Sequence, residues 1–233
     1  MRLTRQVLAD RRGLAAALVA VVALGVTAGV TLGGFSAAIG NPANSFSSGT
    51  IQLKEGVGAT SCFSTGSGSG GTVTAANAGT CASINDLGAS LDQVPGGTPV
   101  STTVTLTNVG NTATTGASLV TSACSAAAAS DDNSYVGSDT SGFCGKVDVT
   151  VANTTSGATD ACVFPTQVGA CPALSNASTL AGLANTTFGT VPMSALAAGA
   201  SATYVITVQL DASATNADQG LTATIPLTWA ITQ

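Results

Sequence analysis

The sequence predicts an antiparallel, jelly-roll-like β-sandwich with one short helix, preceded by a helical signal peptide. Three observations support this fold class. An apolar run follows a basic start, the rest of the chain alternates between apolar and Thr-rich polar positions, and all the cysteines lie in that later part. Several short alternating strands separated by polar turns are typical of sandwiches and jelly rolls.

Residues 1–34 have the layout of a signal peptide. An apolar run extends from Leu14 to Leu32, and small residues follow it. The basic residues before the run are Arg2, Arg5, Arg11 and Arg12. The residues before Ile39, SAA, obey the small-x-small cleavage pattern, whereas LGG before Phe35 obeys it poorly at Leu32. An uncleaved anchor is the alternative because the run is about long enough to span a bilayer. The chain therefore divides into a signal peptide and an exported domain over 35–233.

Removal of the signal peptide changes the charge of the chain. All four arginines are lost, and Lys54 and Lys146 are then the only cations. Of the 11 acidic residues only Asp10 is lost, so 10 acids face 2 lysines and the net charge is −8. Nucleic acids and anionic membranes require clusters of Lys and Arg. We therefore expect no nucleic-acid partner and no membrane attachment after processing.

Six cysteines lie in the exported part: Cys62, Cys81, Cys124, Cys144, Cys162 and Cys171. An even number of cysteines behind a signal peptide predicts three disulfides, for which sequence alone allows fifteen pairings. Pairing of neighbours, 62–81, 124–144 and 162–171, is the simplest hypothesis because each bond closes a short loop. A structural metal site is disfavoured because the chain has no histidine and no C-x-x-C spacing. We therefore expect no cofactor.

Four segments alternate with the period of half-buried antiparallel strands: 98–111, 146–153, 203–210 and 221–231. In 146–153 the valines are predicted to face inward, and Lys146, Asp148 and Thr150 to face outward. Pro226 cannot donate a hydrogen bond to a neighbouring strand, so an edge or a bulge is expected there.

The segments between the predicted strands are expected to be turns and loops. Turn residues occur at 95–97, at 108–111 and at Gly199. Residues 64–72 are predicted to form a flexible loop, and 125–142 a long insertion. The leucines of 173–186 predict the one short helix.

Most catalytic constellations are absent from the sequence. Without histidine there is no Ser-His-Asp triad, Cys-His pair or His-based zinc site. Glu55, the only glutamate, is expected to form a solvated pair with Lys54. The acidic group 131–133 with Asp139 could bind calcium through oxygen ligands, but its spacing is unlike an EF-hand loop, so an exposed acidic loop is expected. We therefore predict no catalytic or metal residues.

Three stretches resemble the TasA/camelysin family. The start of the exported chain, from Phe35 to Leu53, is similar to the family's processed N-terminus. A central strand and turn of the family is similar to the stretch "VPGGTPVSTTVTLTNVGN". The family's closing region is similar to residues 196–233. The matching motif residues are Phe46, Gly49, Thr50, Leu53, Asn108, Gly110, Asn216, Gln219 and Gly220. The six cysteines and their loops depart from the family pattern.

The resemblance implies a secreted jelly-roll protein that assembles into fibres of an extracellular or biofilm matrix at the cell surface. It also implies cleavage between Gly34 and Phe35 by a SipW-type signal peptidase, and makes "FSSGTIQL" (46–53) the first strand. Some camelysin-like members are described as metalloproteases. Since no residues here supply zinc ligands, that activity is not carried over.

Three hypotheses for function follow. The first is a fibre subunit whose partner is a second copy of itself, with 35–48 as a donor segment added to the next subunit's sheet. Phe35, Ala37 and Ile39 alternate as such a strand requires. The second is a monomeric cell-surface adhesion or binding module that uses its disulfide-tied loops. The third, with the least support, is a secreted metalloprotease.

Overall fold

The computed structural model describes residues 48–68, 71–75, 77–88, 93–129, 136–155, 162–185 and 190–233, and Gly49–Gln233 form one compact unit. Several predicted features lie outside the described residues: the signal peptide, its cleavage site at Gly34 and Phe35, the donor candidates Phe35, Ala37 and Ile39, the motif residue Phe46, and the acidic group 131–133. No helix within the described ranges is long and apolar enough to cross a membrane.

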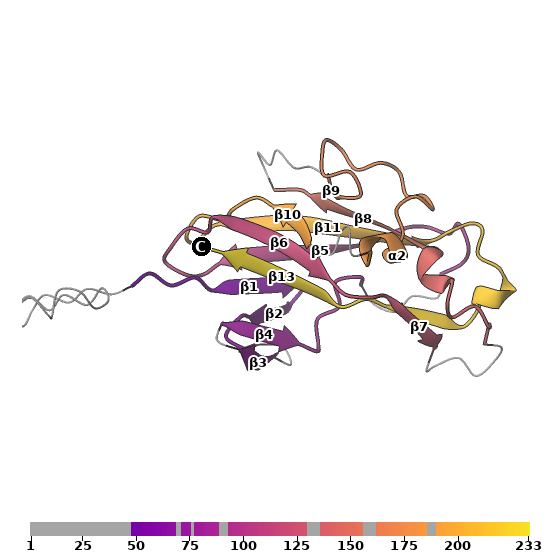
Figure 1. The fold of residues 1–233 in the computed structure, drawn as a ribbon, viewed down its shortest axis with the longest axis horizontal. Helices are drawn as coiled ribbons and strands as arrows, with labels where there is room; N and C mark the ends of the chain where they lie inside the picture. Colours follow the sequence, from indigo (N-terminus) through magenta and orange to yellow (C-terminus); the bar gives the residue numbers. More distant parts are fainter. Residues whose placement is uncertain are drawn as a thin grey trace, which may run out of the picture. The chain divides into compact units, whose positions relative to one another are not determined.

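The larger sheet has six antiparallel strands in the order β2-β1-β5-β11-β8-β9 (Figure 1). Its strands are β1 (Leu53–Val57), β2 (Thr60–Phe63), β5 (Val100–Asn108), β8 (Val147–Asn153), β9 (Cys162–Phe164) and β11 (Ser201–Leu210). The long strands β5 and β11 lie side by side at its centre. This sheet provides one wall of the core.

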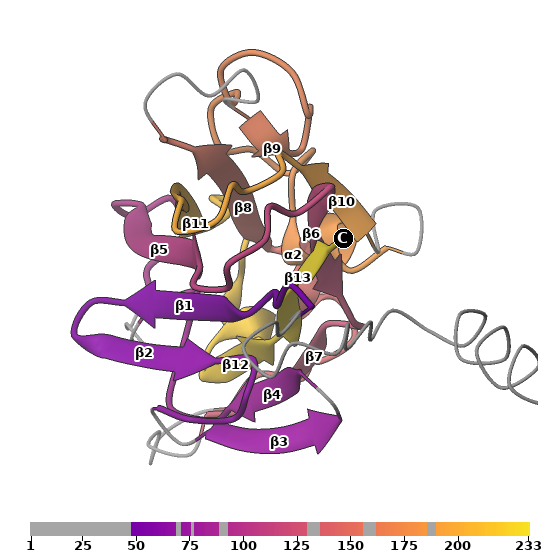
Figure 2. The same ribbon diagram turned by 90° about the vertical axis from the view of Figure 1, so that its left-hand side faces the viewer.

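A second, three-stranded sheet has the order β10-β6-β13 and packs against the first (Figures 1 and 2). Its strands are β6 (Gly116–Thr121), β10 (Thr190–Met193) and β13 (Leu227–Thr232). Leu119 and Trp229 of this sheet meet Leu106, Tyr204 and Ile206 of the larger one in a single apolar core. The rings of Tyr204 and Trp229 lie 5.3 Å apart between their centroids. The predicted antiparallel all-β fold is thus confirmed.

Two small sheets and three short helices complete the described structure. The small sheets pair β3 (Gly71–Ala75) with β4 (Ala78–Cys81), and β7 (Ser125–Ala128) with β12 (Leu221–Thr224). The helices are the 3₁₀ turns η1 (Phe143–Gly145) and η3 (Asn216–Asp218) and the α-helix α2 (Leu180–Leu183). Helix α2 lies within the predicted helical segment 173–186 and buries Leu180 and Leu183.

The predicted strand 221–231 is divided in two at Ile225–Pro226. Strand β12 pairs with β7 before the proline, and β13 pairs with β6 after it. Because Pro226 has no N–H, it cannot continue a ladder, and the chain uses this point to change sheets. The interruption predicted at Pro226 is therefore confirmed.

Other expectations were wrong. The first strand begins at Leu53 rather than at residue 46. Asp148 and Thr150 are buried instead of exposed, because Ser178 and Thr179 cover the edge of β8 beyond the end of β9. The predicted loop 64–72 contains the start of β3, and the predicted insertion 125–142 contains β7.

The structure joins the cysteines in neighbouring pairs, as the simplest hypothesis predicts. Cys62–Cys81 ties β2 to β4, Cys124–Cys144 ties the segment before β7 to η1, and Cys162–Cys171 closes the loop after β9. Disulfides persist in oxidising compartments outside the cytosol. They are consistent with an exported protein.

Candidate functional site

The first motif residues described contact the turn between β5 and β6. The Thr50 carbonyl accepts hydrogen bonds from the backbone N–H groups of Asn111 (3.0 Å) and Thr112 (3.2 Å). In return, the Thr50 N–H donates to Asn111 Oδ1 at 2.6 Å. Gln52 accepts from the Val109 N–H at 2.8 Å. Two motifs far apart in the sequence thus form one structure, which we call the N-terminal junction (residues 49–53 with 108–112).

Glycines permit the close approach of the two segments at the N-terminal junction. A Cβ atom at Gly110 would lie 2.3 Å from the Thr50 carbonyl oxygen and 2.7 Å from Ile51 Cα. At Gly49 a Cβ would overlap the Thr112 hydroxyl. Gly110 therefore requires glycine for steric reasons, because the atoms that a Cβ would meet belong to the backbone, whereas at Gly49 the Thr112 side chain would have to rotate. The junction fixes the backbone path of the domain's first residues, 49–53.

Asn108 connects the N-terminal junction to the loop before β11. Its side chain is fully buried, and its Nδ2 donates to the carbonyls of Thr112 (2.8 Å) and Leu196 (3.2 Å). Its Oδ1 accepts from the Gly110 N–H at 3.1 Å. One amide side chain therefore satisfies three backbone groups that have no strand partner.

Asn108→Ala is expected to destabilise the domain by about 2 kcal/mol, because it removes the side-chain partners of the Thr112 carbonyl and the Gly110 N–H and opens a small cavity. The free energy of unfolding from urea titration measures this loss. Asn111→Ala is the matched control at an exposed position of the same turn, and we expect it to cost less than half as much. Equal costs would contradict the role assigned to Asn108.

The C-terminal motif residues have a local structural role. Asn216 begins η3, Gln219 follows its last residue as the C-cap, and Gly220 adopts a positive φ of 64° in the turn into β12. Asn216 and Gln219 are exposed, whereas Asp218, which the motif omits, is buried. Asp218 Oδ2 accepts from the Thr215 N–H at 2.8 Å, which completes a capping box. These residues do not contact the N-terminal junction in any bond described here.

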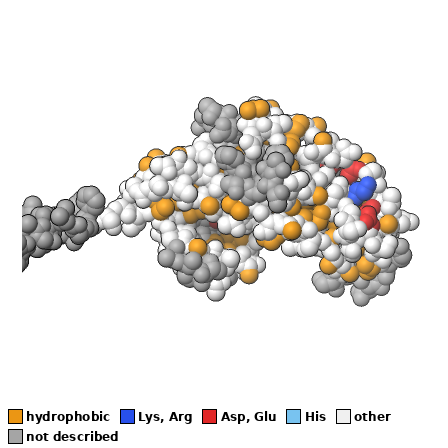
Figure 3. All heavy atoms as spheres, viewed as in Figure 1, with side chains coloured by type: hydrophobic (Ala, Val, Ile, Leu, Met, Phe, Trp, Pro, Cys, Tyr) orange, Lys and Arg blue, Asp and Glu red, His pale blue; other side chains and the backbone are white. Residues whose placement is uncertain are grey.

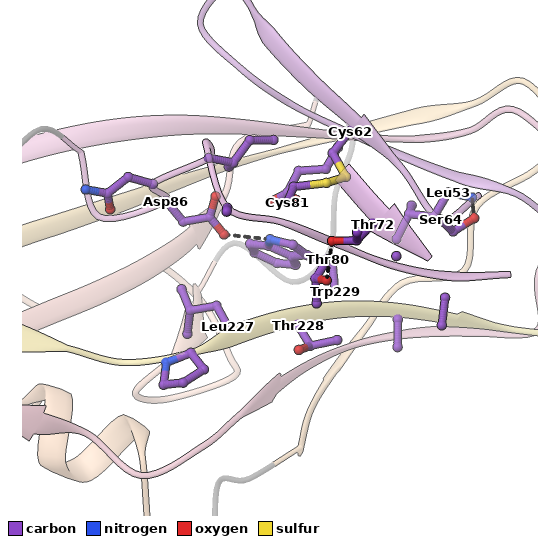
Figure 4. A pocket seen from close by; sticks show the side chains of 18 of the residues that line it. Leu53, Cys62, Ser64, Thr72, Thr80, Cys81, Asp86, Leu227, Thr228 and Trp229 are labelled. Atoms are coloured by element: carbon purple, nitrogen blue, oxygen red, sulfur yellow. Dashed lines mark hydrogen bonds between the residues drawn. A yellow bond between two sulfur atoms is a disulfide. The ribbon is translucent and has the colours of Figure 1, made fainter. Parts of the chain in front are cut away.

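A hollow of about 880 Å³ lies beside β13 (Figure 4). It is lined by β1, β2, the β3–β4 hairpin, the segment after β4 up to Leu87, and residues 222–231. Figure 2 shows the same elements around this region. Its volume is within the range of ligand clefts in proteins. No residue of the hollow was predicted from the sequence as a site, apart from the cysteines and the motif residue Leu53.

Two carboxyl groups face the hollow. Glu55, on β1, was predicted to form a solvated pair with Lys54, but it points inward and interacts with Asp86. Adjacent residues of a strand face opposite sides. Lys54 accordingly lies away from the hollow, with its Nζ 5.7 Å from the centre of the Phe63 ring. Glu55 keeps some contact with solvent, whereas Asp86 is only 9% exposed.

Trp229 holds Asp86 in place. The Trp229 Nε1–H donates to Asp86 Oδ2 at 2.8 Å, drawn as a dashed line in Figure 4. In that view the indole ring lies next to the Cys62–Cys81 disulfide, which covers the hollow from the β2–β4 side. The other oxygen, Asp86 Oδ1, is buried and receives no hydrogen bond from an N–H or hydroxyl group of the described residues. The neighbouring Glu55 can supply a donor to this pair only when it is protonated.

Burial changes the ionisation of the pair. Desolvation, followed by the negative charge of Asp86 and hydrogen bonding to it, raises the pKa of Glu55 from 4.5 to about 8, although Trp229 acts in the opposite direction. Desolvation also raises the pKa of Asp86. At neutral pH Glu55 is therefore largely protonated, and burial shifts the pKa of both carboxyl groups in the direction that disfavours ionisation.

Strand β13 offers an unpaired edge along the hollow. Among the described residues it pairs only with β6. The Ser122 N–H donates to the Pro226 carbonyl, and the Thr115 N–H to the Thr232 carbonyl, so even-numbered positions of this segment direct their backbone groups at β6. Because the ladder alternates, the backbone groups of Trp229 and Ile231 point away from β6, towards the open edge.

Charged side chains elsewhere are few. On the face shown in Figure 3 they gather in one small patch among polar uncharged and hydrophobic groups. Lys146 donates to Ser213 Oγ at 2.9 Å. Asp139, the described member of the acidic group, accepts from the Gly142 N–H at 2.9 Å and so stabilises a turn. Within the described ranges, no three Cys, Asp or Glu side chains gather as a metal site would require.

Neither a scan against protein-family models nor a search of curated proteins gives a match to this chain. The candidate site therefore rests on its own geometry: a hollow, a carboxyl pair fixed by Trp229, and an unpaired strand edge.

Proposed function

We propose that the processed chain is a secreted structural protein, a subunit of an extracellular matrix fibre that assembles by strand exchange. In this assembly the N-terminal segment of one copy adds to the edge of β13 in the next. The observation that supports this proposal is the combination of an unpaired β13 edge with the hollow beside it. Edge strands that run along a cleft are the usual acceptors in β-augmentation, because the ladder gives affinity and the cleft takes alternate side chains.

The surface composition suits such a role. Natural proteins protect exposed strand edges with charges, prolines or covering segments. Within β13 the sequence LTWAIT carries no charge and no proline, so nothing in the strand itself opposes pairing. In the proposed jelly roll, the three disulfides would stabilise a domain that must function outside the cell.

The proposal predicts that the chain 35–233 forms filaments and that a chain lacking residues 35–47 does not. Electron microscopy and sedimentation velocity measure assembly, and far-UV circular dichroism confirms that both chains are folded. Ile231→Pro should also abolish filaments, since it removes an N–H directed at the open edge, whereas Ile231→Val retains that group and should assemble normally. Filaments from the truncated chain would rule out strand exchange by the N-terminal segment.

A monomeric adhesion module is the second candidate function. The disulfide Cys162–Cys171 closes a loop in which Val168 is 72% exposed, and a loop held at the surface in this way can present side chains to a partner. A chain that remains monomeric at high concentration and binds cells through this loop would favour the second candidate over the first.

A further inference from the structure

The carboxyl pair in the hollow has no counter-ion among the residues that the structure describes. Asp86 is buried, Glu55 is partly buried, and neither lysine of the exported chain offsets their charge. Lys54 lies over the Phe63 ring, and Lys146 is hydrogen-bonded to Ser213. A buried negative charge is costly unless a cation or several donors compensate it. Here the Trp229 N–H donates to Asp86 Oδ2, Asp86 Oδ1 has no N–H or hydroxyl donor among the described residues, and the proton on Glu55 is the remaining donor to the pair.

The exported chain can supply one further cation. Its sequence from residue 35 onward contains no arginine, no histidine and only the two lysines already placed. Cleavage of the signal peptide creates an α-ammonium group at the new N-terminus, which is protonated up to a pH of about 8. Before cleavage this nitrogen belongs to a peptide bond and carries no charge. Processing therefore produces the one cation that assembly between identical chains can use.

We propose that the hollow is the docking site for the processed N-terminus of a second copy, whose α-ammonium group at Phe35 binds between Glu55 and Asp86. This inference rests on the proposed function, because it requires that the N-terminal segment be exchanged between subunits. It adds a recognition element to that exchange. The segment after Phe35 then runs along the open edge of β13, which borders the same hollow.

The charges and dimensions are compatible with this arrangement. An ammonium group carries a positive charge and only hydrogen-bond donors, so it suits a buried carboxyl pair in which Asp86 Oδ1 has no N–H or hydroxyl donor among the described residues. Leu53, Ile84, Leu87 and Ile225 provide apolar walls for the Phe35 ring. Residues 35–47 span roughly 40 Å when extended, about twice the length of β13 at ~3.3 Å per residue. The segment can therefore reach the hollow, pair with β13 and still connect to its own domain.

The arrangement would also couple assembly to export. An unprocessed chain has no ammonium group at position 35 and would carry the apolar run of the signal peptide in its place. Its insertion would bury the uncompensated charge of the carboxyl pair. We therefore expect subunits to assemble only after the signal peptide is removed.

Two synthetic peptides of residues 35–47 test this inference, one with a free amino terminus and one N-acetylated. Each is titrated into the dilute chain 35–233. Trp229 is the only tryptophan in the chain and donates to Asp86, so its fluorescence reports directly on the hollow. We expect the free-amine peptide to change Trp229 emission, to inhibit filament growth, and to bind at least tenfold more tightly than the acetylated peptide.

Two double variants test whether the preference for the free-amine peptide depends on the carboxyl pair. The double variant Glu55→Gln, Asp86→Asn keeps the shapes and the Trp229 hydrogen bond but removes the charge, and should bind both peptides equally weakly. The control Asp139→Asn, Asp211→Asn removes two acids away from the hollow and should retain the tenfold preference. Equal binding of the two peptides by the unmodified chain would overturn the inference, and so would Trp229 emission that does not respond while filaments still form.

Two further outcomes separate this inference from the proposed function. If the chain 35–233 forms no filaments yet discriminates between the peptides, the fibre proposal fails and the ammonium site is supported. If Trp229 emission depends on the chain's own free terminus at every protein concentration, each copy occupies its own hollow, and docking of a second copy is overturned.

Discussion

Glu55→Gln is expected to stabilise the domain at alkaline pH and to remove most of the pH dependence of its stability between pH 5 and pH 8. In the native protein, burial beside Asp86 holds a proton on Glu55 up to a pH of about 8. Glutamine has the same shape, is neutral at every pH and can donate a hydrogen bond to Asp86 through its amide. The variant therefore reproduces the protonated form of the pair permanently.

Proton linkage determines whether the stability of the domain rises or falls as the pH increases. The pKa of Glu55 is 4.5 when it is unperturbed and about 8 in the folded chain, so the folded state binds the proton more tightly. The associated stability is fully present below pH 4.5 and is lost as the pH rises through about 8. Complete burial would make the loss approach 5 kcal/mol, at about 1.4 kcal/mol for each pKa unit. Because Glu55 keeps contact with solvent, we expect about 2 kcal/mol.

Urea titrations of the dilute chain 35–233 at one-unit steps from about pH 4 to pH 9 measure this effect. Asp148→Asn is the matched control, since desolvation and the nearby Asp211 raise the pKa of Asp148 to about 6, and Asp148 does not line the hollow. That variant should remove only the slope between about pH 4 and pH 6. An unchanged slope between pH 6 and pH 8 in Glu55→Gln would show that Glu55 is ionised in the folded chain.

The strands that the sequence predicted best are those with strict alternation. In β5 Val104 and Leu106 occupy alternate positions, as Tyr204 and Ile206 do in β11, and all four are buried in the structure. The hairpin β3–β4 and strand β7 consist mainly of Gly, Ala, Ser and Thr, whose side chains give no hydrophobic period. The positions of these strands are determined instead by their pairing partners and by the disulfides, and neither can be deduced from the local hydrophobic pattern of the sequence.

The candidate site was missed for a similar reason. Glu55 and Asp86 are separated by 30 intervening positions, and Trp229 lies at the far end of the chain, so only the tertiary fold brings them together. The neighbour Lys54 suggested an ion pair, but strand geometry directs the two side chains to opposite faces. One signal was available: a single glutamate in an alternating segment whose apolar neighbours face the core. The junction between Thr50 and Asn111 likewise needed contacts that sequence order conceals.

Removal of the Cys62–Cys81 disulfide is expected to cost about 3 kcal/mol of stability and to open the hollow. The bond closes a loop with a sequence separation of 19 residues, and loops of this length gain about 3 kcal/mol from restriction of the unfolded chain. It also fixes the β3–β4 hairpin over the hollow. In the Cys62→Ala, Cys81→Ala variant the hairpin loses this attachment, so water gains access to Trp229, whose side chain is only 8% exposed in the intact domain.

The Cys124→Ala, Cys144→Ala variant separates these two effects. Its disulfide spans 20 residues, so the loss of chain restriction is nearly the same, but neither cysteine lines the hollow. Urea titration should give similar losses of stability for both variants. Trp229 emission should shift to longer wavelength only when Cys62–Cys81 is absent, because only that bond holds the cover of the hollow in place. A shift of equal size in both variants would mean that the hairpin does not shield Trp229, and the disulfide would then contribute to stability alone.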